Sequence, residues 1–297
     1  MSFCFVNIRH KYEKETVLDI PSLSIKPGEF FAFTGPEGSG KSTILRLIGG
    51  LELPSEGRVS FDQIPLGETV STSDVVFLDA TNFLSPPSHN IALFDDLLRG
   101  FDESCRESVC RKLSALHSQL RTTFIFSTTN PDDALRVSDR IAVVDSGRIR
   151  QVGRPCELVD KPRDTFVASF IGTPSMNIVP GILEKDGAAV EIGPRAVELS
   201  GVVEENYVRD VFLGIRPEHV RVLPDPSSGW RGKVSRVEVM EESTLVSVRV
   251  DGGEFTASYK KKSAYQSGDS VALSMESKYF HVFDERGQRL CLRRGSR

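Results

Sequence analysis

The spacing of apolar residues changes character partway along the chain. In its first part, short apolar runs alternate with segments whose apolar residues recur at helical intervals, a pattern that predicts a largely parallel α/β sheet. Ile44, Leu47, Ile48 and Leu51 have this helical spacing, so we expect a helix there. The predicted strands are Phe30–Phe33, Val75–Leu78, Ile91–Phe94, Phe124–Phe126 and Ile141–Val144.

Strand-forming patterns dominate from about residue 181 onward. Leu245–Val250 alternates apolar and polar residues, and a turn at Asp251–Gly253 leads into Glu254–Tyr259, which together predict a β-hairpin. We therefore expect the second half to form a small barrel or sandwich. Turn-forming residues between positions 172 and 177 interrupt both patterns, so the predicted domains are residues 1–171 and residues 172–297.

Composition and charge exclude several classes of protein. The 297 residues are 39% hydrophobic and 26% charged, close to the average of globular proteins. A net charge of −4 leaves no broad basic surface, so we expect no nucleic-acid partner, and the isolated run Lys260–Lys262 favours a solvated loop. The five scattered cysteines include no C-x-x-C pair, which argues against a disulfide framework or a zinc site. No apolar run approaches the roughly 18 residues of a membrane helix.

One segment matches the phosphate-binding pattern G-x-x-x-x-G-K-[ST]. Its residues are Gly35, Pro36, Glu37, Gly38, Ser39, Gly40, Lys41, Ser42 and Thr43. A predicted strand runs into the segment and a predicted helix leaves it, which is the context that this motif requires. Backbone N–H groups of the loop and of the helix N-terminus would then surround a phosphate. We expect Lys41 to reach the β- and γ-phosphates and Ser42 to coordinate Mg²⁺, so the predicted cofactors are ATP and Mg²⁺.

A pair of acidic residues follows the predicted strand Ile91–Phe94. In phosphate-loop proteins, a carboxylate at the end of a buried strand holds Mg²⁺ through water, and Asp95 is our candidate for this role. Asp96 is the weaker candidate, for a general base. An alternative interpretation makes the pair an acidic N-terminus of a helix, where it would only cap.

With these motifs placed, the chain resembles the ATPase subunits of ABC importers, in particular their sugar and glycerol-phosphate branch. Further matches are Gly28–Phe30, Phe101–Asp102, Asp139–Val143, Gly147–Ile149, Gln151–Gly153, Gly214–His219 and Phe283–Asp284. The resemblance implies an α/β P-loop NTPase domain followed by a small all-β barrel of the TOBE or MOP-like type. It also implies that Tyr12 stacks against adenine.

The departures from that family concern its helical subdomain. Leu78 stands where the family has a glutamine that senses Mg²⁺ and contacts the permease, and the pentapeptide L-S-G-G-Q does not occur in the sequence. Only 16 residues separate Leu78 from Asp95, enough for a loop around residues 82–89 but not for several helices. We therefore expect the subdomain that carries L-S-G-G-Q to be missing.

Two catalytic positions also differ from the family. Asp96 replaces the general-base glutamate, and the shorter side chain would retract the carboxylate by roughly 1 Å, at a cost on the order of 10²-fold in rate. Thr129 replaces the switch histidine, and a hydroxyl group cannot carry the charge of an imidazole. His117 lies on a predicted helix, where we expect a structural role.

These features predict an ATP-binding subunit of an ABC transporter, for import of a sugar or related solute, with impaired hydrolysis. The expected partner is a second, intact ABC ATPase subunit, in a heterodimer rather than a homodimer, with indirect contact to permease subunits. Such a subunit would be cytoplasmic, at the inner face of the membrane. The alternatives are a hydrolysis-competent importer ATPase, an ATP-sensing regulator without a transport role, and a compact P-loop phosphotransferase.

Overall fold

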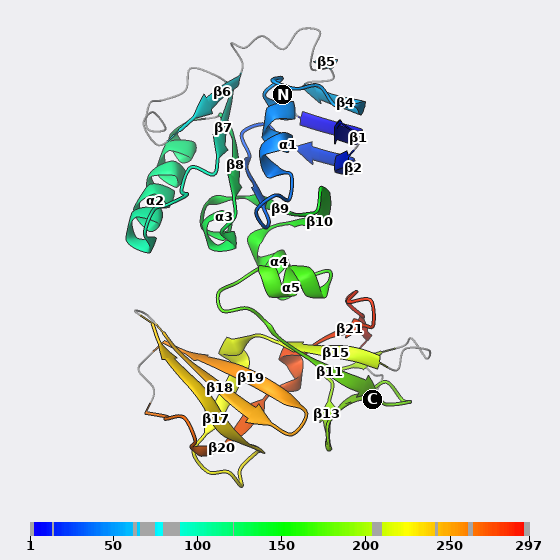
Figure 1. The fold of residues 1–297 in the computed structure, drawn as a ribbon, viewed down its shortest axis with the longest axis vertical. Coiled ribbons are helices and arrows are strands. Elements are labelled where there is room, and N and C mark those ends of the chain that lie inside the picture. Colours follow the sequence, from blue (N-terminus) through cyan, green and yellow to red (C-terminus); the bar gives the residue numbers. More distant parts are fainter. Residues whose placement is uncertain are drawn as a thin grey trace. The chain divides into compact units, whose positions relative to one another are not determined.

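A computed structural model gives the fold as two compact units, residues 1–161 and residues 162–297 (Figure 1). The residues described are 3–13, 15–61, 64–65, 75–79, 90–120, 122–203, 210–240, 243–260 and 264–293. The loop expected around residues 82–89 therefore lies outside the described residues, as do Lys261 and Lys262. Within the described ranges, no helix is both long enough and apolar enough to cross a membrane.

The first unit combines two sheets with four helices among its described residues. Its strands are β1 (Phe3–Tyr12), β2 (Glu15–Ile25), β3 (Phe30–Thr34), β4 (Glu56–Phe61), β5 (Ile64–Pro65), β6 (Val75–Leu78), β7 (Ile91–Asp95), β8 (Thr123–Thr128), β9 (Arg140–Asp145) and β10 (Arg148–Gly153). Its helices are α1 (Lys41–Ile48), α2 (Glu103–Gln119), α3 (Pro131–Val137) and α4 (Pro155–Asp160).

The larger sheet has the strand order β10-β9-β3-β8-β7-β6. All its neighbours are parallel except β9 and β10, which are antiparallel. Residues of β3 and β8 are buried throughout, as expected for parallel strands covered on both faces. The five strands predicted in this part of the chain are confirmed, with ends within one or two residues of the expected ones.

A second, antiparallel sheet in this unit was not predicted. Its order is β2-β1-β4-β5, and it packs through residues such as Ile8, Leu18 and Ile20 against α1. The opposite side of α1 faces Phe31 and Phe33 of the larger sheet, so the helix lies between the two sheets. The pattern apolar-x-apolar in Leu18–Ile20 and Leu23–Ile25 was the available signal for this sheet.

The expected helix at α1 is shorter than its apolar spacing predicted. It ends at Ile48, and Gly50 adopts a left-handed conformation with φ of 68°. Such a residue ends a helix, because it turns the chain away from the helical path. Leu51 consequently lies beyond the helix and is 65% exposed, so its inclusion in the expected helix was wrong.

The other face of the larger sheet is covered by α2. The ring of His117 packs between Phe30 and Phe124, with centroid distances of 5.1 and 5.0 Å, and its Nε2 lies 3.1 Å from the carbonyl oxygen of Gly28. Burial lowers the pKa of His117 below its ordinary value. These contacts are those of a packing residue, as expected from the sequence.

The second unit is built mainly from antiparallel strands. Its helical elements are α5 (Thr165–Phe170) and the short 3₁₀ turns η1 (Pro217–His219) and η2 (Ser277–Tyr279). Its strands are β11 (Asn177–Leu183), β12 (Ala189–Ile192), β13 (Arg195–Glu198), β14 (Val202–Val203), β15 (Asp210–Ile215), β16 (Val220–Leu223), β17 (Trp230–Val239), β18 (Thr244–Val250), β19 (Gly253–Tyr259), β20 (Ser270–Met275), β21 (His281–Asp284) and β22 (Leu292–Arg293).

These strands form two five-stranded sheets and one two-stranded ribbon. The sheet orders are β13-β12-β11-β15-β21 and β16-β20-β17-β18-β19, and β14 pairs with β22. Both larger sheets contribute buried side chains, including Leu213 and Val248, to one apolar core. The hairpin predicted from the alternation after residue 244 is confirmed as β18 and β19.

Candidate nucleotide-binding site

The phosphate loop joins β3 to α1 at the carboxyl edge of the larger sheet. A Cβ atom on Gly35 would lie 1.9 Å from the carbonyl oxygen of Val144, so only glycine allows the loop to pass this close to β9. Gly40 caps α1 with φ of 99°, and no side chain caps the first turn. The first N–H groups of the helix are therefore available to an anion.

Lys41 folds back over the loop that precedes it. Its Nζ donates to the carbonyl oxygens of Gly35 at 2.9 Å and Pro36 at 2.7 Å, and to Oγ of Ser39 at 3.2 Å. Burial lowers the pKa of Lys41, while the carboxylates of Asp96, Asp95 and Glu37 act in the opposite direction. The ammonium group thus has three protein acceptors that phosphate oxygens can replace.

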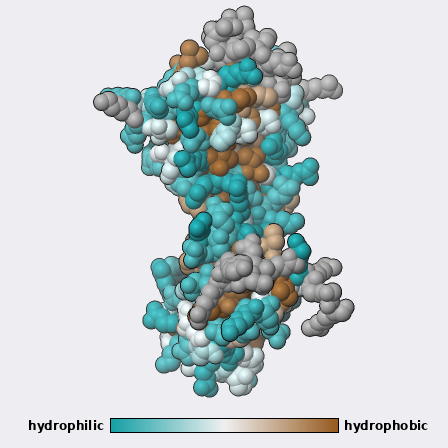
Figure 2. Space-filling view, turned by 90° about the vertical axis from the view of Figure 1, so that its right-hand side faces the viewer, coloured by the Kyte–Doolittle hydropathy of each residue, from teal (hydrophilic) through white to brown (hydrophobic). Residues whose placement is uncertain are grey.

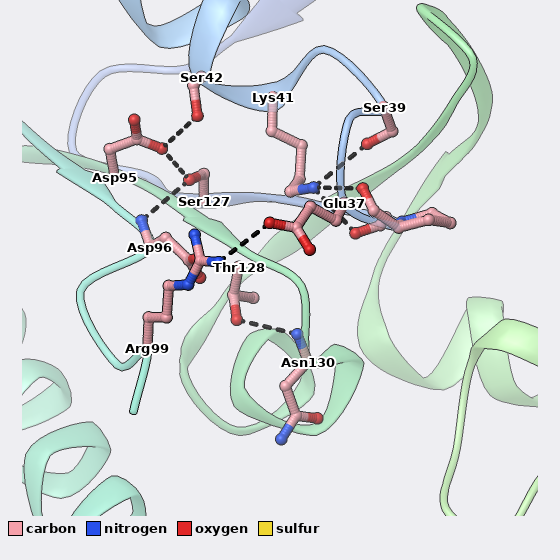
Figure 3. A network of polar contacts seen from close by, with 12 residues as sticks. Glu37, Ser39, Lys41, Ser42, Asp95, Asp96, Arg99, Ser127, Thr128 and Asn130 are labelled. Carbon is pink, nitrogen blue, oxygen red and sulfur yellow. Dashed lines mark hydrogen bonds and ion pairs between the residues drawn. The ribbon is translucent and has the colours of Figure 1, made fainter. Parts of the chain in front are cut away.

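Asp95 lies at the end of β7 and collects two hydroxyl groups (Figure 3). Its Oδ1 accepts from Oγ of Ser42 at 3.0 Å and from Oγ of Ser127 at 2.6 Å. Asp95 and Ser127 are register partners across β7 and β8, so the parallel pairing itself places them side by side. Hydroxyl and carboxylate oxygens are the ligands that Mg²⁺ prefers, and this group fits such an ion.

The alternative interpretation of the acidic pair as a helix N-terminus does not match the structure. The next helix, α2, begins at Glu103, and its cap is Asp102, whose Oδ1 accepts from the N–H of Cys105 at 2.8 Å. Asp95 and Asp96 therefore stand apart from that N-terminus.

Asp96 adopts an unusual backbone conformation beside the same cluster. Its φ is 47°, and its N–H donates to both the carbonyl oxygen and Oγ of Ser127, each at 3.1 Å. Its carboxylate lies 4.0 Å from the guanidinium group of Arg99, which also donates to Glu37 of the phosphate loop at 3.0 Å. This Arg99–Glu37 contact connects the phosphate loop to the segment after β7.

The segment after β8 carries the position where the related family has its switch histidine. Thr129 is exposed there, between Thr128, whose side chain is buried, and Asn130. The N–H of Asn130 donates to Oγ1 of Thr128 at 3.1 Å, and Oδ1 of Asn130 caps α3 by accepting from Asp132 at 3.0 Å. In the described contacts, Asn130 thus has a capping role.

Tyr12, expected to face adenine, lies at the end of β1 and is 41% exposed. Its hydroxyl group donates to Glu52 at 2.6 Å, and Arg46 of α1 lies 3.3 Å from the other oxygen of Glu52. The ring edge of buried His10 approaches the Tyr12 ring at 4.9 Å. The described contacts do not link Tyr12 to Lys41 or Asp95, whereas they link Ser42 to Asp95 directly.

Sequence reasoning missed two contacts of this site, Ser127 with Asp95 and Arg99 with Glu37. Ser127 was not singled out, although it ends a buried strand next to β7, and the carboxyl ends of neighbouring parallel strands converge. The contact between Arg99 and Glu37 had no local signal in the sequence, because the two residues are 62 positions apart.

Comparison with known proteins agrees with this geometry. Residues 18–130 match the family model described as ABC transporter, residues 172–220 match the MalK OB fold domain, and residues 213–283 match the TOBE domain. The solved structure of cbiO1 from Clostridium perfringens, part of the ABC transporter complex cbiONQ, has a TM-score of 0.47 at 19% identity, over 52% of this chain and 89% of that one.

Two relatives match almost the whole chain. The trehalose/maltose import ATP-binding protein MalK of Thermococcus litoralis is 28% identical, over 94% of this chain and 96% of that protein. The sn-glycerol-3-phosphate import ATP-binding protein UgpC of Escherichia coli O157:H7 is 25% identical, over 93% of this chain and 96% of that protein. The first alignment spans 361 positions, more than the 297 residues of this chain, so MalK has stretches without a counterpart here.

The ABC transporter match lies within the first compact unit, and the OB fold and TOBE matches lie within the second. The phosphate loop, Lys41 and the Ser42–Asp95 pair lie within the first matched region. The chain therefore has the fold of an ABC ATPase P-loop domain followed by all-β domains that match the MalK OB fold and TOBE models.

Proposed function

We propose that this protein binds Mg·ATP between the phosphate loop and Asp95 as the ATP-binding subunit of an importer for a sugar or a related solute. The observation that carries the proposal is the group of oxygens around Asp95 Oδ1, beside the uncapped N-terminus of α1. Residues 35–43 would surround the phosphates, and Ser42 with Asp95 would hold Mg²⁺. The import names of MalK and UgpC support the substrate class.

Titration calorimetry of the full chain with ATP tests this site. We expect Mg·ATP to bind in the micromolar to millimolar range, and Asp95→Asn to weaken the Mg²⁺-dependent part of the affinity. Asp160→Asn, at the exposed end of α4, is the matched control. The proposal fails if ATP binds equally with and without Mg²⁺, or if Asp95→Asn behaves as the control does.

Weak hydrolysis is the second part of the proposal. Asp96 is one methylene shorter than glutamate, and its N–H donates to Ser127, which holds its backbone at the end of β8. Thr129 offers a hydroxyl group in place of an imidazole. A shortened general base and a missing imidazole each reduce stabilisation of the transition state.

The third part of the proposal concerns the partner. ABC ATPases of importers work as dimers with permease subunits. This sequence has no L-S-G-G-Q and only 16 residues between Leu78 and Asp95. Two copies of this chain could therefore not close each other's ATP sites. A heterodimer with an intact ATPase would place the partner's closing loop over this chain's ATP, at the inner face of the membrane.

Sedimentation with and without Mg·ATP tests the partner assignment. We expect the isolated chain to stay monomeric at ATP concentrations that saturate it, and to copurify from its source with a second ATPase. An ATP-dependent homodimer of the isolated chain would instead favour a self-sufficient ATPase. Copurification without any second ATPase or permease would favour an ATP-sensing regulator.

A further inference from the structure

A cavity in the second unit lies outside every residue of the nucleotide site. Its volume is about 510 Å³, and it lies on the sheet β13-β12-β11-β15-β21. Strands β11, β12 and β15 and the turn after β21 supply its lining. Cavities of roughly 300–1,000 Å³ are typical of small-molecule sites.

The strand register explains the chemistry of this cavity. Ile182 of β11 is paired with Glu191 of β12 on one side and with Asp210 of β15 on the other. Directly opposed residues point to the same face of a sheet, so these three side chains form one row. Pro180 and Phe212, paired with each other, form the next row on the same face. An apolar floor is therefore bordered by carboxylates.

A third carboxylate completes the border. Glu285 follows the end of β21, a strand that pairs with β15, and it lines the cavity together with Asp210. Among the described residues, no cation or hydrogen-bond donor contacts the carboxylates of Glu191, Asp210 or Glu285, and all three residues are exposed. Three carboxylates around one cavity, none of which contacts a cation among the described residues, favour the binding of a cation.

The apolar surface of this face is confined to the cavity. One part of the face is already covered, because Ile178 packs against the cluster of Ala168, Met176 and Phe283 around α5. Phe212 packs only partly against the same cluster and also lines the cavity. Of the described residues in this sheet, Ile182 is the one large apolar side chain that is substantially exposed, at 38%. A protein partner would need a contact surface of about 800 Å² on each side. A small apolar floor suits a small ligand better. On the one face that Figure 2 draws, the apolar patches of this unit are bordered by hydrophilic residues.

We propose that this cavity binds a small organic cation. The apolar body of the ligand lies on Pro180, Ile182 and Phe212, and its ammonium or guanidinium group lies among Glu191, Asp210 and Glu285. Such a ligand would bind to the β unit, so the site could respond to a solute independently of ATP. The proposal does not depend on hydrolysis or on the identity of any partner.

The test compares two probes on the full chain by calorimetry or ligand-observed NMR. The first probe is 4-phenylbutylamine, and the second is 4-phenylbutanol, its neutral analogue with the same carbon skeleton. We expect the amine to bind at least about 10-fold more tightly than the alcohol, a difference of about 1.4 kcal/mol. The amine's advantage should shrink as salt is added, because the carboxylates are exposed.

Variants assign the binding to the cavity. Asp210→Asn combined with Glu285→Gln should weaken amine binding about 5-fold or more, because two exposed ion pairs are lost. Glu198→Gln combined with Glu218→Gln removes the same charge from exposed positions outside the cavity and should change the affinity by less than about 2-fold. Ile182→Ala should weaken both probes, because the apolar floor is reduced.

Four results would overturn the proposal. These are equal affinity for amine and alcohol, no effect of the cavity variant, the same effect from the control variant, and no saturable binding up to about 10 mM amine. A basic amphipathic peptide serves as a further probe. If it bound more tightly than the amine and lost affinity in the same cavity variant, the face would be a protein-docking surface and not a small-molecule site.

Discussion

Replacing Lys41 by alanine removes the ammonium group that now holds the phosphate loop. That group has three acceptors within the loop, and Lys41 is only 6% exposed, so ATP must exchange protein contacts for phosphate contacts. A charge-assisted hydrogen bond contributes about 1.5–3 kcal/mol, whereas an ordinary one contributes about 1 kcal/mol. Two new bonds to phosphate oxygens, less two lost loop bonds, leave a net contribution of about 1–4 kcal/mol.

This difference corresponds to a loss of about 5- to 700-fold in ATP affinity. Calorimetric titration of the full chain with Mg·ATP measures it. Lys112→Ala, at an exposed position of α2, is the matched control and should bind ATP as the wild type does. Equal ATP affinity in Lys41→Ala and the wild type would refute the assignment of the site. A urea titration of both variants in the absence of ATP checks that the fold is retained.

Three further predictions concern hydrolysis and stability. If the proposed weak hydrolysis is right, Asp96→Glu should leave ATP turnover, measured by phosphate release, close to background, because Thr129 has no imidazole and the sequence has no L-S-G-G-Q; a rise to about 1 s⁻¹ or more would contradict this. Asp133→Ala should lower the free energy of unfolding by about 3–5 kcal/mol, since it leaves Arg106 without its buried partner at 2.8 Å, and Asp132→Ala is the control in the same urea titration. Burial, together with Arg289, Arg216 and His219, lowers the pKa of His281 from 6.5 to about 4. The unfolded chain therefore binds a proton between these values when the folded chain does not, and stability is lost as pH falls through this window. Urea unfolding followed by fluorescence of Trp230, the one tryptophan of the chain, should show a loss of about 2 kcal/mol from pH 7 to pH 5. His281→Gln should remove most of that loss, and an unchanged pH dependence in this variant would contradict the explanation.

The parts of the fold that follow a simple repeat could be predicted from the sequence. Strands β3, β7 and β8 are buried on both faces, so each is a continuous apolar run that is visible without any tertiary information. The phosphate loop was equally visible, because its chemistry depends on residues that are adjacent in the sequence.

Features that depend on packing between distant segments could not be predicted in this way. The extent of α1 was overestimated because Leu51 continues the apolar period, whereas the backbone turn at Gly50 decides where the helix ends. The contact of Ser127 with Asp95 depends on the register between two strands, which the sequence does not specify locally. The antiparallel sheet of β1 and β2 was missed because the alternation breaks once in each strand: the buried residues Phe5 and Ile8, and likewise Ile20 and Leu23, lie three positions apart.

The left-handed backbone at Asp96 has an evolutionary consequence. A residue other than glycine in this conformation costs stability of the order of 1 kcal/mol, and the strain is independent of whether the carboxylate takes part in hydrolysis. If the carboxylate had no function, substitution by glycine would relieve the strain without a functional cost, so glycine would be expected at this position in some orthologues. Retention of aspartate at this position among orthologues would then indicate selection for its charge. A mixture with glycine or asparagine would indicate that this selection has been lost. The residue found at position 96 among orthologues would therefore indicate whether this subunit still hydrolyses ATP.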